Sequence, residues 1–134
     1  MKNTVRDIIP QDLVIMESWF KAWNIPFPKS EDLPNNGLCG IVLERNKVAI
    51  LIAMIYLTNS KQAYVSVISD PKESNRGVKE EYEMFISNLL VKIKQWGCTS
   101  VSAITKIDKV IEQLKDYGFS FTEKEYASGF CRLL

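Results

Sequence analysis

The sequence predicts an α+β fold of three layers, in which a mixed β-sheet carries helices on both faces. Apolar residues at helical spacing alternate along the chain with short strand-like segments. Val48–Leu57 is apolar almost without interruption, which is typical of a central strand buried on both faces. Short polar turns separate the strands of the first half and favour antiparallel hairpins there. The chain has 134 residues, and we expect residues 1–134 to form a single domain.

The first half of the chain is predicted to form a strand, a helix and a meander. Val5–Ile9 is the first strand and ends at Pro10, which has no N–H for a sheet. Asp12 is the expected N-cap of a helix whose apolar face extends to Trp23. The other expected elements of this half are a proline-rich loop at Asn24–Gly37 and strands at Cys39–Leu43, Val48–Leu57 and Ala63–Ser69.

The stretch from Ala63 to Gly97 organises the rest of the chain as a strand, a polar loop and an amphipathic helix. The strand ends at Asp70-Pro71, and Gly77 in the loop is free to take a positive φ. The helix spans Glu81–Trp96 and ends at Gly97. A loop that opens a helix receives backbone N–H groups and the positive end of the helix dipole, a general design for binding phosphate. After it we expect a strand at Thr99–Ile104, a helix from Asp108 to Tyr117-Gly118, and strands at Phe119–Phe121 and Tyr126–Leu134.

Composition excludes several classes of function. The net charge is +1, so no electrostatic footprint for nucleic acid or an anionic membrane is present. The chain has no histidine, which excludes a Ser-His-Asp or Cys-His mechanism within one chain. Its three cysteines are widely spaced and form no CxxC pair, so we expect free thiols and no metal site. The charged N-terminus does not resemble a signal peptide, and Val48–Leu57 is shorter than the about 20 residues of a membrane-spanning helix.

The element order and three local motifs resemble the GNAT acyltransferase superfamily over essentially the whole chain. Asp70-Pro71 stands where the fourth strand of that family ends in a V-x-P turn. The helix Glu81–Trp96, closing on Gly97, looks like the family's "LL…A…G" helix, and IEQLKDYGF at Ile111–Phe119 is similar to its "LYEKLGF" signature. Finer details are similar to small GNAT-like proteins encoded by bacteriophages: Trp19 and Trp23 precede IPFPKSEDLP, and YLTNS precedes VISDP.

The resemblance implies acetyl-CoA as cosubstrate, bound in a gap where the fourth and fifth strands diverge. The backbone of Ile68 and Ser69 would contact the pantetheine arm. Tyr64 and Ser66 alternate with Val65 and Val67 along the same strand, and the sequence does not fix which pair faces the gap. The pyrophosphate would be held at the start of the following helix by Arg76, Gly77, Val78 and Lys79.

The chain departs from the family's R/Q-x-x-G-x-G/A pyrophosphate loop. Counting back from Gly97 places Glu80 and Tyr82 at the two glycine positions, and counting forward from Arg76 places Lys79 and Glu81 there. Two carboxylates would then add negative charge near the pyrophosphate, although acidic residues are also common in a first helical turn. The cofactor assignment therefore depends on strands that diverge beyond Ser69 and on a helix start that acidic side chains do not fill.

The catalytic groups are less well defined. The general acid of the family is a tyrosine that protonates the departing thiolate, and Leu114 stands at the matching position. Tyr117, three residues later, is the candidate substitute, or it anchors the end of the helix. Asp70 is the candidate base, with Glu44 and Tyr56 also expected near the cleft; alternatively, water accepts the proton.

Two functions remain open at this point. The first is an acetyl-CoA-dependent N-acetyltransferase, in which an amine of a small molecule or a protein attacks the thioester directly. The second is a catalytically inactive GNAT-fold phage protein that acts as a binding or virion-associated module, which the missing glycines and Leu114 favour. We expect a cytoplasmic location (the host cytoplasm if phage-encoded) and no nucleic-acid or membrane partner. An exposed terminal strand would allow a homodimer.

Overall fold

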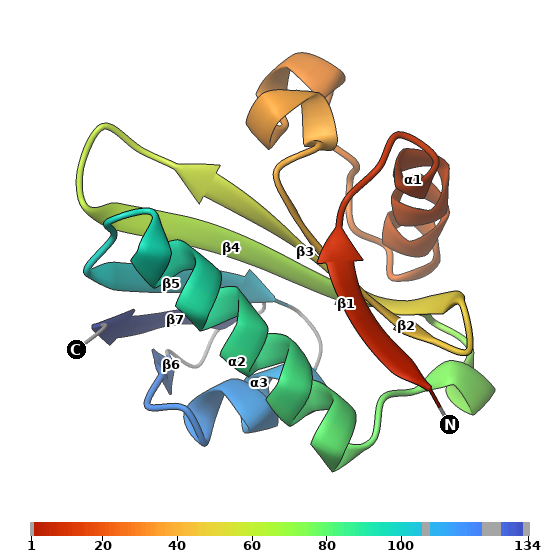
Figure 1. The fold of residues 1–134 in the computed structure, drawn as a ribbon. Helices are drawn as coiled ribbons and strands as arrows, with labels where there is room; N and C mark the ends of the chain where they lie inside the picture. Colours follow the sequence, from red (N-terminus) through yellow and green to blue (C-terminus); the bar gives the residue numbers. More distant parts are fainter. Residues whose placement is uncertain (1, 106–107, 122–126, 133–134) are drawn as a thin grey trace.

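The structure is a computed structural model that describes residues 2–105, 108–121 and 127–132 (Figure 1). Over these residues it confirms the predicted order of strands and helices, with boundaries shifted by a few residues. Three short 3₁₀ turns, η1 (Ser30–Asp32), η2 (Pro34–Gly37) and η3 (Glu73–Asn75), lie in the loops. The strands are β1 (Asn3–Asp7), β2 (Gly40–Arg45), β3 (Val48–Leu57), β4 (Gln62–Ser69), β5 (Ser100–Thr105), β6 (Ser120–Phe121) and β7 (Ala127–Arg132), and the helices are α1 (Asp12–Ala22), α2 (Lys79–Gln95) and α3 (Asp108–Lys115).

Within the described ranges the strands form one seven-stranded mixed sheet in the order β1-β2-β3-β4-β5-β7-β6. Every neighbouring pair is antiparallel except β4 and β5, which are parallel and are connected through α2. The α+β fold class is therefore confirmed. The last strand, β7, lies between β5 and β6, so edge-to-edge pairing with a second copy would use β1 or β6.

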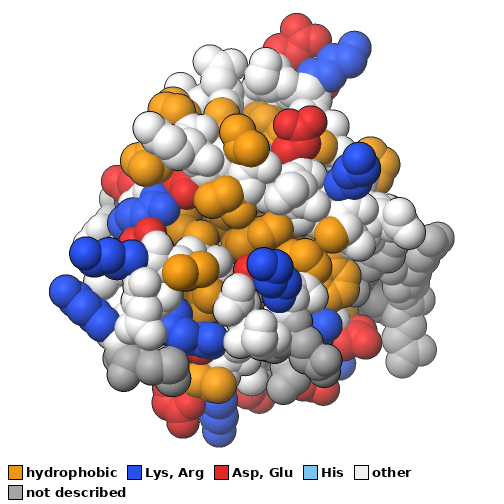
Figure 2. Space-filling view, turned by 90° about the vertical axis from the view of Figure 1, so that its right-hand side faces the viewer, with side chains coloured by type: hydrophobic (Ala, Val, Ile, Leu, Met, Phe, Trp, Pro, Cys, Tyr) orange, Lys and Arg blue, Asp and Glu red, His pale blue; other side chains and the backbone are white. Residues whose placement is uncertain are grey.

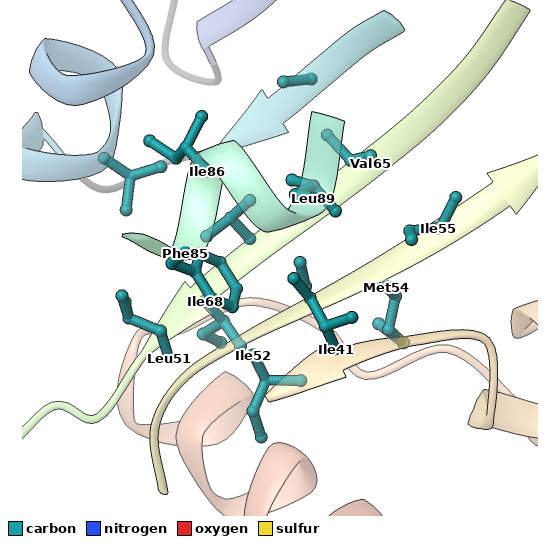
Figure 3. Packing of buried hydrophobic residues seen from close by; sticks show 14 of the residues in the cluster. Ile41, Leu51, Ile52, Met54, Ile55, Val65, Ile68, Phe85, Ile86 and Leu89 are labelled. Carbon is teal, nitrogen blue, oxygen red and sulfur yellow. The ribbon is translucent and has the colours of Figure 1, made fainter. Parts of the chain in front are cut away.

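The helices cover the two faces of this sheet, with α1 on one face and α2 and α3 on the other (Figure 1). Phe85, Ile86 and Leu89 of α2 point into the apolar core against the sheet (Figure 3). β3 lies inside the sheet and is buried along nearly its whole length, as its apolar run predicts. Among the described helices, none combines the length and the apolar character needed to cross a bilayer.

Two local predictions need correction. Asp12 is the first residue of α1 rather than its N-cap, because Gln11 before it is already helical (φ −63°, ψ −24°). The Asp12 carboxylate instead accepts hydrogen bonds from the Ile9 N–H at 2.8 Å and from the Arg6 guanidinium at 2.7 and 2.9 Å. Gly77 does not take a positive φ, whereas Gly97 does (φ 87°), as expected of a residue that ends a helix.

Candidate active site

Within the described residues, the pairing of β4 with β5 ends before β4 does. The two strands are in register from Gln62–Ser100 to Ser66–Ile104, and β4 then continues to Ser69 paired with β3. At the next position the Thr105 hydroxyl donates to the Val67 carbonyl at 3.4 Å. The described pairing of β4 with β5 thus ends at Ser66, before Ser69, the residue beyond which the strands are predicted to diverge. We call the space beside β4 from Val67 to Ser69 the gap.

The register decides which main-chain groups face the gap. The Asp70 N–H donates to the Ile50 carbonyl at 3.0 Å, and antiparallel pairs alternate in direction. The backbone of Ile68 therefore also faces β3, whereas the N–H and C=O of Ser69 face the gap. The Ser69 carbonyl accepts the indole N–H of Trp23 at 2.9 Å. The Ser69 amide N–H has no acceptor among the described residues. Of Ile68 and Ser69, which were both predicted to contact the ligand through the main chain, only Ser69 has main-chain groups that face the gap.

Two cavities adjoin the last paired position of β4 and β5, on the α1 face of the sheet. Of the two alternating pairs, Tyr64 and Ser66 line the second cavity, whereas Val67 lines the first and Val65 lines neither. The first cavity, of about 80 Å³, lies under α1 and contains the Ile68 side chain in its wall. The second, of about 420 Å³, is an open groove lined by Tyr56, Tyr64, Ser66 and Ile104, and Ser66 and Ile104 belong to both walls.

The start of α2 carries backbone donors, one of which is already used. Val78, the N-cap residue, is extended (φ −94°, ψ 167°), and its N–H donates to the Glu81 carboxylate at 2.9 Å. The next two amides, those of Lys79 and Glu80, have no acceptor among the described residues, as is usual in a first helical turn. The positive end of the α2 dipole therefore presents two unused N–H groups.

Glu81 fills part of this helix start, but its charge is neutralised. Its carboxylate is buried and binds the Arg45 guanidinium through two hydrogen bonds, one of 2.8 Å from Nε. Hydrogen bonding to Arg45, opposed by burial, holds the pKa of Glu81 below its ordinary value. Arg45 also donates to the Arg76 carbonyl at 2.8 Å, which ties β2 to the loop before α2. The negative charge expected from Glu80 and Glu81 is thus limited to the exposed Glu80.

Gly77 is required for close packing rather than for its φ. A Cβ built at Gly77 would lie 2.9 Å from Cε2 of Tyr82, whose side chain is buried. Tyr82 and Glu81 both stand where a family glycine is expected, and both side chains are buried. Of these departures, Glu81 occupies the Val78 N–H, and the amides of Lys79 and Glu80 keep no acceptor among the described residues.

Among the described residues, no carboxylate forms an ion pair with Arg76. Its guanidinium lies 5.5 Å from the centre of the Trp23 ring, within cation–π range. It donates no hydrogen bond within the described part of the chain, and its Nε is buried without a partner. Sequence reasoning missed the role of Trp23, because its position on an apolar helix face indicates only core packing. The indole joins two predicted site residues, Ser69 and Arg76.

The candidate bases have other partners. Asp70 is buried, and its carboxylate accepts the Lys72 N–H at 2.9 Å and the Asn75 side-chain amide at 3.0 Å, so it shapes the loop. Glu44 forms an ion pair with Arg6 at 3.2 Å. Tyr56 does line the groove, and burial, with a further contribution from Asp32, raises the pKa of its phenol.

Tyr117 lies on the other face of the sheet. Its hydroxyl donates to the Glu83 carbonyl of α2 at 3.1 Å and lies 3.2 Å from the Ser87 hydroxyl. Leu114, at the family's tyrosine position, is fully buried in the core. The structure therefore favours the anchoring role of Tyr117, which ties the end of α3 to α2.

Comparison with known proteins identifies the fold. No family model and no curated protein sequence match the chain. Solved structures do: Ard1 from Thermoplasma volcanium has a TM-score of 0.74 at 13% identity, covering 100% of this chain and 99% of that one. A GNAT superfamily phosphinothricin acetyltransferase from Sinorhizobium meliloti, in complex with acetyl-CoA, has a TM-score of 0.72 at 17% identity, covering 99% of this chain and 89% of that one. The ribosomal-protein-S18-alanine N-acetyltransferase from Escherichia coli has a TM-score of 0.70 at 12% identity, covering 98% of this chain and 93% of that one. The chain thus has the fold of GNAT N-acetyltransferases.

Proposed function

We propose that this protein is an acetyl-CoA-dependent N-acetyltransferase acting on an amine. The observation that carries the proposal is a set of donors without an acceptor among the described residues: the Ser69 amide beside the gap, and the Lys79 and Glu80 amides with the Arg76 guanidinium at the start of α2. Anions bind at helix starts through such amides, and arginine matches phosphate geometry. The acetyl-CoA complex of the S. meliloti enzyme, which shares the fold, supports the same ligand class.

The residues fit the charged end of CoA better than its arm. Arg76 and the two amides of α2 supply positive potential for a diphosphate. The occupied Val78 amide reduces the number of donors by one. The cavity of about 80 Å³ beside Ser66 holds only two or three waters, each of about 30 Å³, so the gap has to widen before a pantetheine arm enters.

Acetyl-CoA would supply an activated acetyl thioester, and the chain would supply orientation. In the proposed reaction the amine nitrogen bonds to the acetyl carbon and the amine loses a proton. The C–S bond breaks, its electron pair leaves with the CoA sulfur, and the resulting thiolate takes up a proton to give CoA thiol. The Ser69 N–H is placed to stabilise negative charge developing on the acetyl oxygen. The groove lined by Tyr56, Tyr64, Ser66 and Ile104 would hold the acceptor. Because burial raises the pKa of Tyr56, its phenol stays protonated and does not serve as the base, so water would take the amine proton.

The face that carries α1 and the N-terminus suits a ligand with apolar and anionic parts (Figure 2). Hydrophobic side chains gather across the middle of this face, and several Lys and Arg side chains lie on one flank. Apolar contact supplies affinity for an uncharged arm, while cations attract phosphate at longer range.

Two observations favour a second function, a GNAT-fold binding module without catalysis. The carboxylate of Glu81 already caps Val78, and Leu114 replaces the expected acid. This alternative predicts a stable ligand-free protein that captures a macromolecular partner and leaves acetyl-CoA unchanged.

Calorimetry and turnover together test the proposal. Acetyl-CoA titrated into the protein should bind with a micromolar Kd, and CoA thiol should be released from acetyl-CoA in the presence of members of an amine panel. The absence of binding at millimolar acetyl-CoA would refute the proposal. Binding without thiol release from any amine would favour the binding module.

The anchoring role of Tyr117 gives a separate prediction. Tyr117→Phe should lower the free energy of unfolding by about 1 kcal/mol, because the Glu83 carbonyl loses its donor. Acetyl transfer should stay within about twofold of the wild type, since no reacting group is near. Urea unfolding and steady-state kinetics measure the two effects. A kcat reduced by about 100-fold at unchanged stability would instead identify Tyr117 as the general acid.

A further inference from the structure

Trp23 ends α1 at the gap. It is the C-cap residue (φ −85°, ψ 3°), and its half-buried side chain reaches Ser69 on β4, 46 positions away in the sequence. The chain leaves the helix immediately after it, at Asn24, which has a positive φ of 58°. A side chain at the end of a helix is held by fewer neighbours than one in the middle of it, so a change of rotamer disturbs little of the core.

The indole occupies the acceptor that faces the gap. The Ser69 carbonyl points away from β3, toward the gap. In the ligand-free protein the Trp23 N–H satisfies this carbonyl at 2.9 Å. An amide N–H of a ligand lying along β4 would use the same acceptor, and the indole lies at the carbonyl on the side that faces the gap.

The same indole also holds the Arg76 guanidinium. The guanidinium carbon lies 5.5 Å from the ring centre, while the buried Nε of Arg76 has no acceptor among the described residues. A phosphate oxygen would satisfy that donor and would draw the guanidinium off the ring. Each contact of Trp23 is therefore one that a ligand with an amide arm and a diphosphate would replace.

We propose that Trp23 is a gate that closes the gap and withdraws when CoA binds. The inference rests on the proposed function, because it takes CoA as the ligand. The gate favours a ligand that carries both an amide and a phosphate, because only such a ligand replaces both of the contacts that hold the indole.

The gate has a thermodynamic signature. Contacts made only in the ligand-free state oppose binding by their own free energy. Removing them should destabilise the ligand-free protein and tighten CoA binding by the same factor. A purely structural tryptophan would lower the stability of both states and leave Kd unchanged. A tryptophan that contacts the bound ligand would weaken binding when replaced.

Trp23→Phe keeps an aromatic ring at this position and removes the N–H donor. CoA should therefore bind about fivefold more tightly, the factor that corresponds to one net hydrogen bond. Trp23→Leu also removes the ring, and the gain should reach about twentyfold. Trp19→Phe, one turn earlier in α1 and buried in the core, is the matched control and should leave Kd unchanged. Calorimetry with CoA gives Kd, and urea unfolding gives the ligand-free stability.

Tryptophan emission supplies an independent readout. CoA should change the emission of the wild type and of Trp19→Phe, whereas Trp23→Phe should show little change. An equal or weaker affinity of Trp23→Phe, with the wild type binding CoA, would overturn the gate and leave the proposed function standing. If neither the wild type nor any variant binds CoA, the proposed function fails and the gate with it.

Discussion

Glu81→Ala is expected to lower the free energy of unfolding by about 3 kcal/mol, the scale on which breaking a buried ion pair destabilises a protein. The substitution leaves the nearly buried Arg45 guanidinium without its carboxylate and removes the acceptor of the Val78 N–H. It also loosens the link between β2 and the start of α2. Urea unfolding of the variant and the wild type at neutral pH measures the difference.

Glu80→Gln provides the control for this prediction. Glu80 is exposed and lies in the same helical turn as Glu81, and its substitution by Gln removes the same charge. We expect its effect to stay within about 0.5 kcal/mol. Equal losses for the two variants would contradict the account, since they would mean that the Arg45–Glu81 pair contributes no more than a surface charge.

The lowered pKa of Glu81 also sets a pH dependence. A carboxyl whose pKa is lower in the folded state binds fewer protons there than in the unfolded chain, so its contribution to stability rises with pH. That contribution is fully present above the unfolded pKa of about 4.3 and is lost as the pH falls through the lower folded value. The stability difference between the wild type and Glu81→Gln should therefore shrink below about pH 4. A difference that stays constant from pH 7 to pH 3 would contradict this.

Arg76→Met is expected to weaken CoA binding by about 10- to 100-fold, because a charge-assisted hydrogen bond contributes about 1.5–3 kcal/mol. The guanidinium has no other anion among the described residues, so no internal ion pair competes with the phosphate. The loss should become smaller as salt rises, since screening weakens the wild-type contact. Calorimetry at low and high ionic strength measures both effects.

Two controls isolate the phosphate contact. Lys72→Met removes one positive charge from the same loop at an exposed side chain, and we expect a change of less than about threefold. Pantetheine, which lacks the diphosphate, should bind Arg76→Met and the wild type equally. A loss of pantetheine binding, or an equal effect of Lys72→Met on CoA, would show that Arg76 acts through the fold or through net charge.

Local periodicity was sufficient to predict the fold. The uninterrupted apolar run at Val48–Leu57 indicated an interior strand, and the structure buries β3 within the sheet. The helical spacing of Phe85, Ile86 and Leu89 indicated the face of α2 that packs on the sheet. The N-cap role of Asp12 was wrong, because a carboxylate near a helix start can equally bind an arginine from a neighbouring strand.

The sequence indicated which segments would form the candidate site, but not which of their atoms would face it. The strand–loop–helix order predicted the start of α2 as a phosphate site, and the resemblance to GNAT acyltransferases implied the gap beside β4. The sequence could not show that Ile68 faces β3, since main-chain direction depends on the register with β3. It also missed Trp23 and Arg45, whose partners lie far away in the sequence. Pairings of this kind leave no local pattern.

The most direct test of the central claim is the response of individual backbone amides to CoA in ¹H–¹⁵N correlation spectra. If the gap and the start of α2 bind a ligand that carries a diphosphate, the largest chemical-shift changes at saturation should be those of the Ser69, Lys79 and Glu80 amides and of the Arg76 Nε–H. Saturable binding that leaves the Lys79 and Glu80 amides unmoved would contradict the claim, and so would shifts confined to another face.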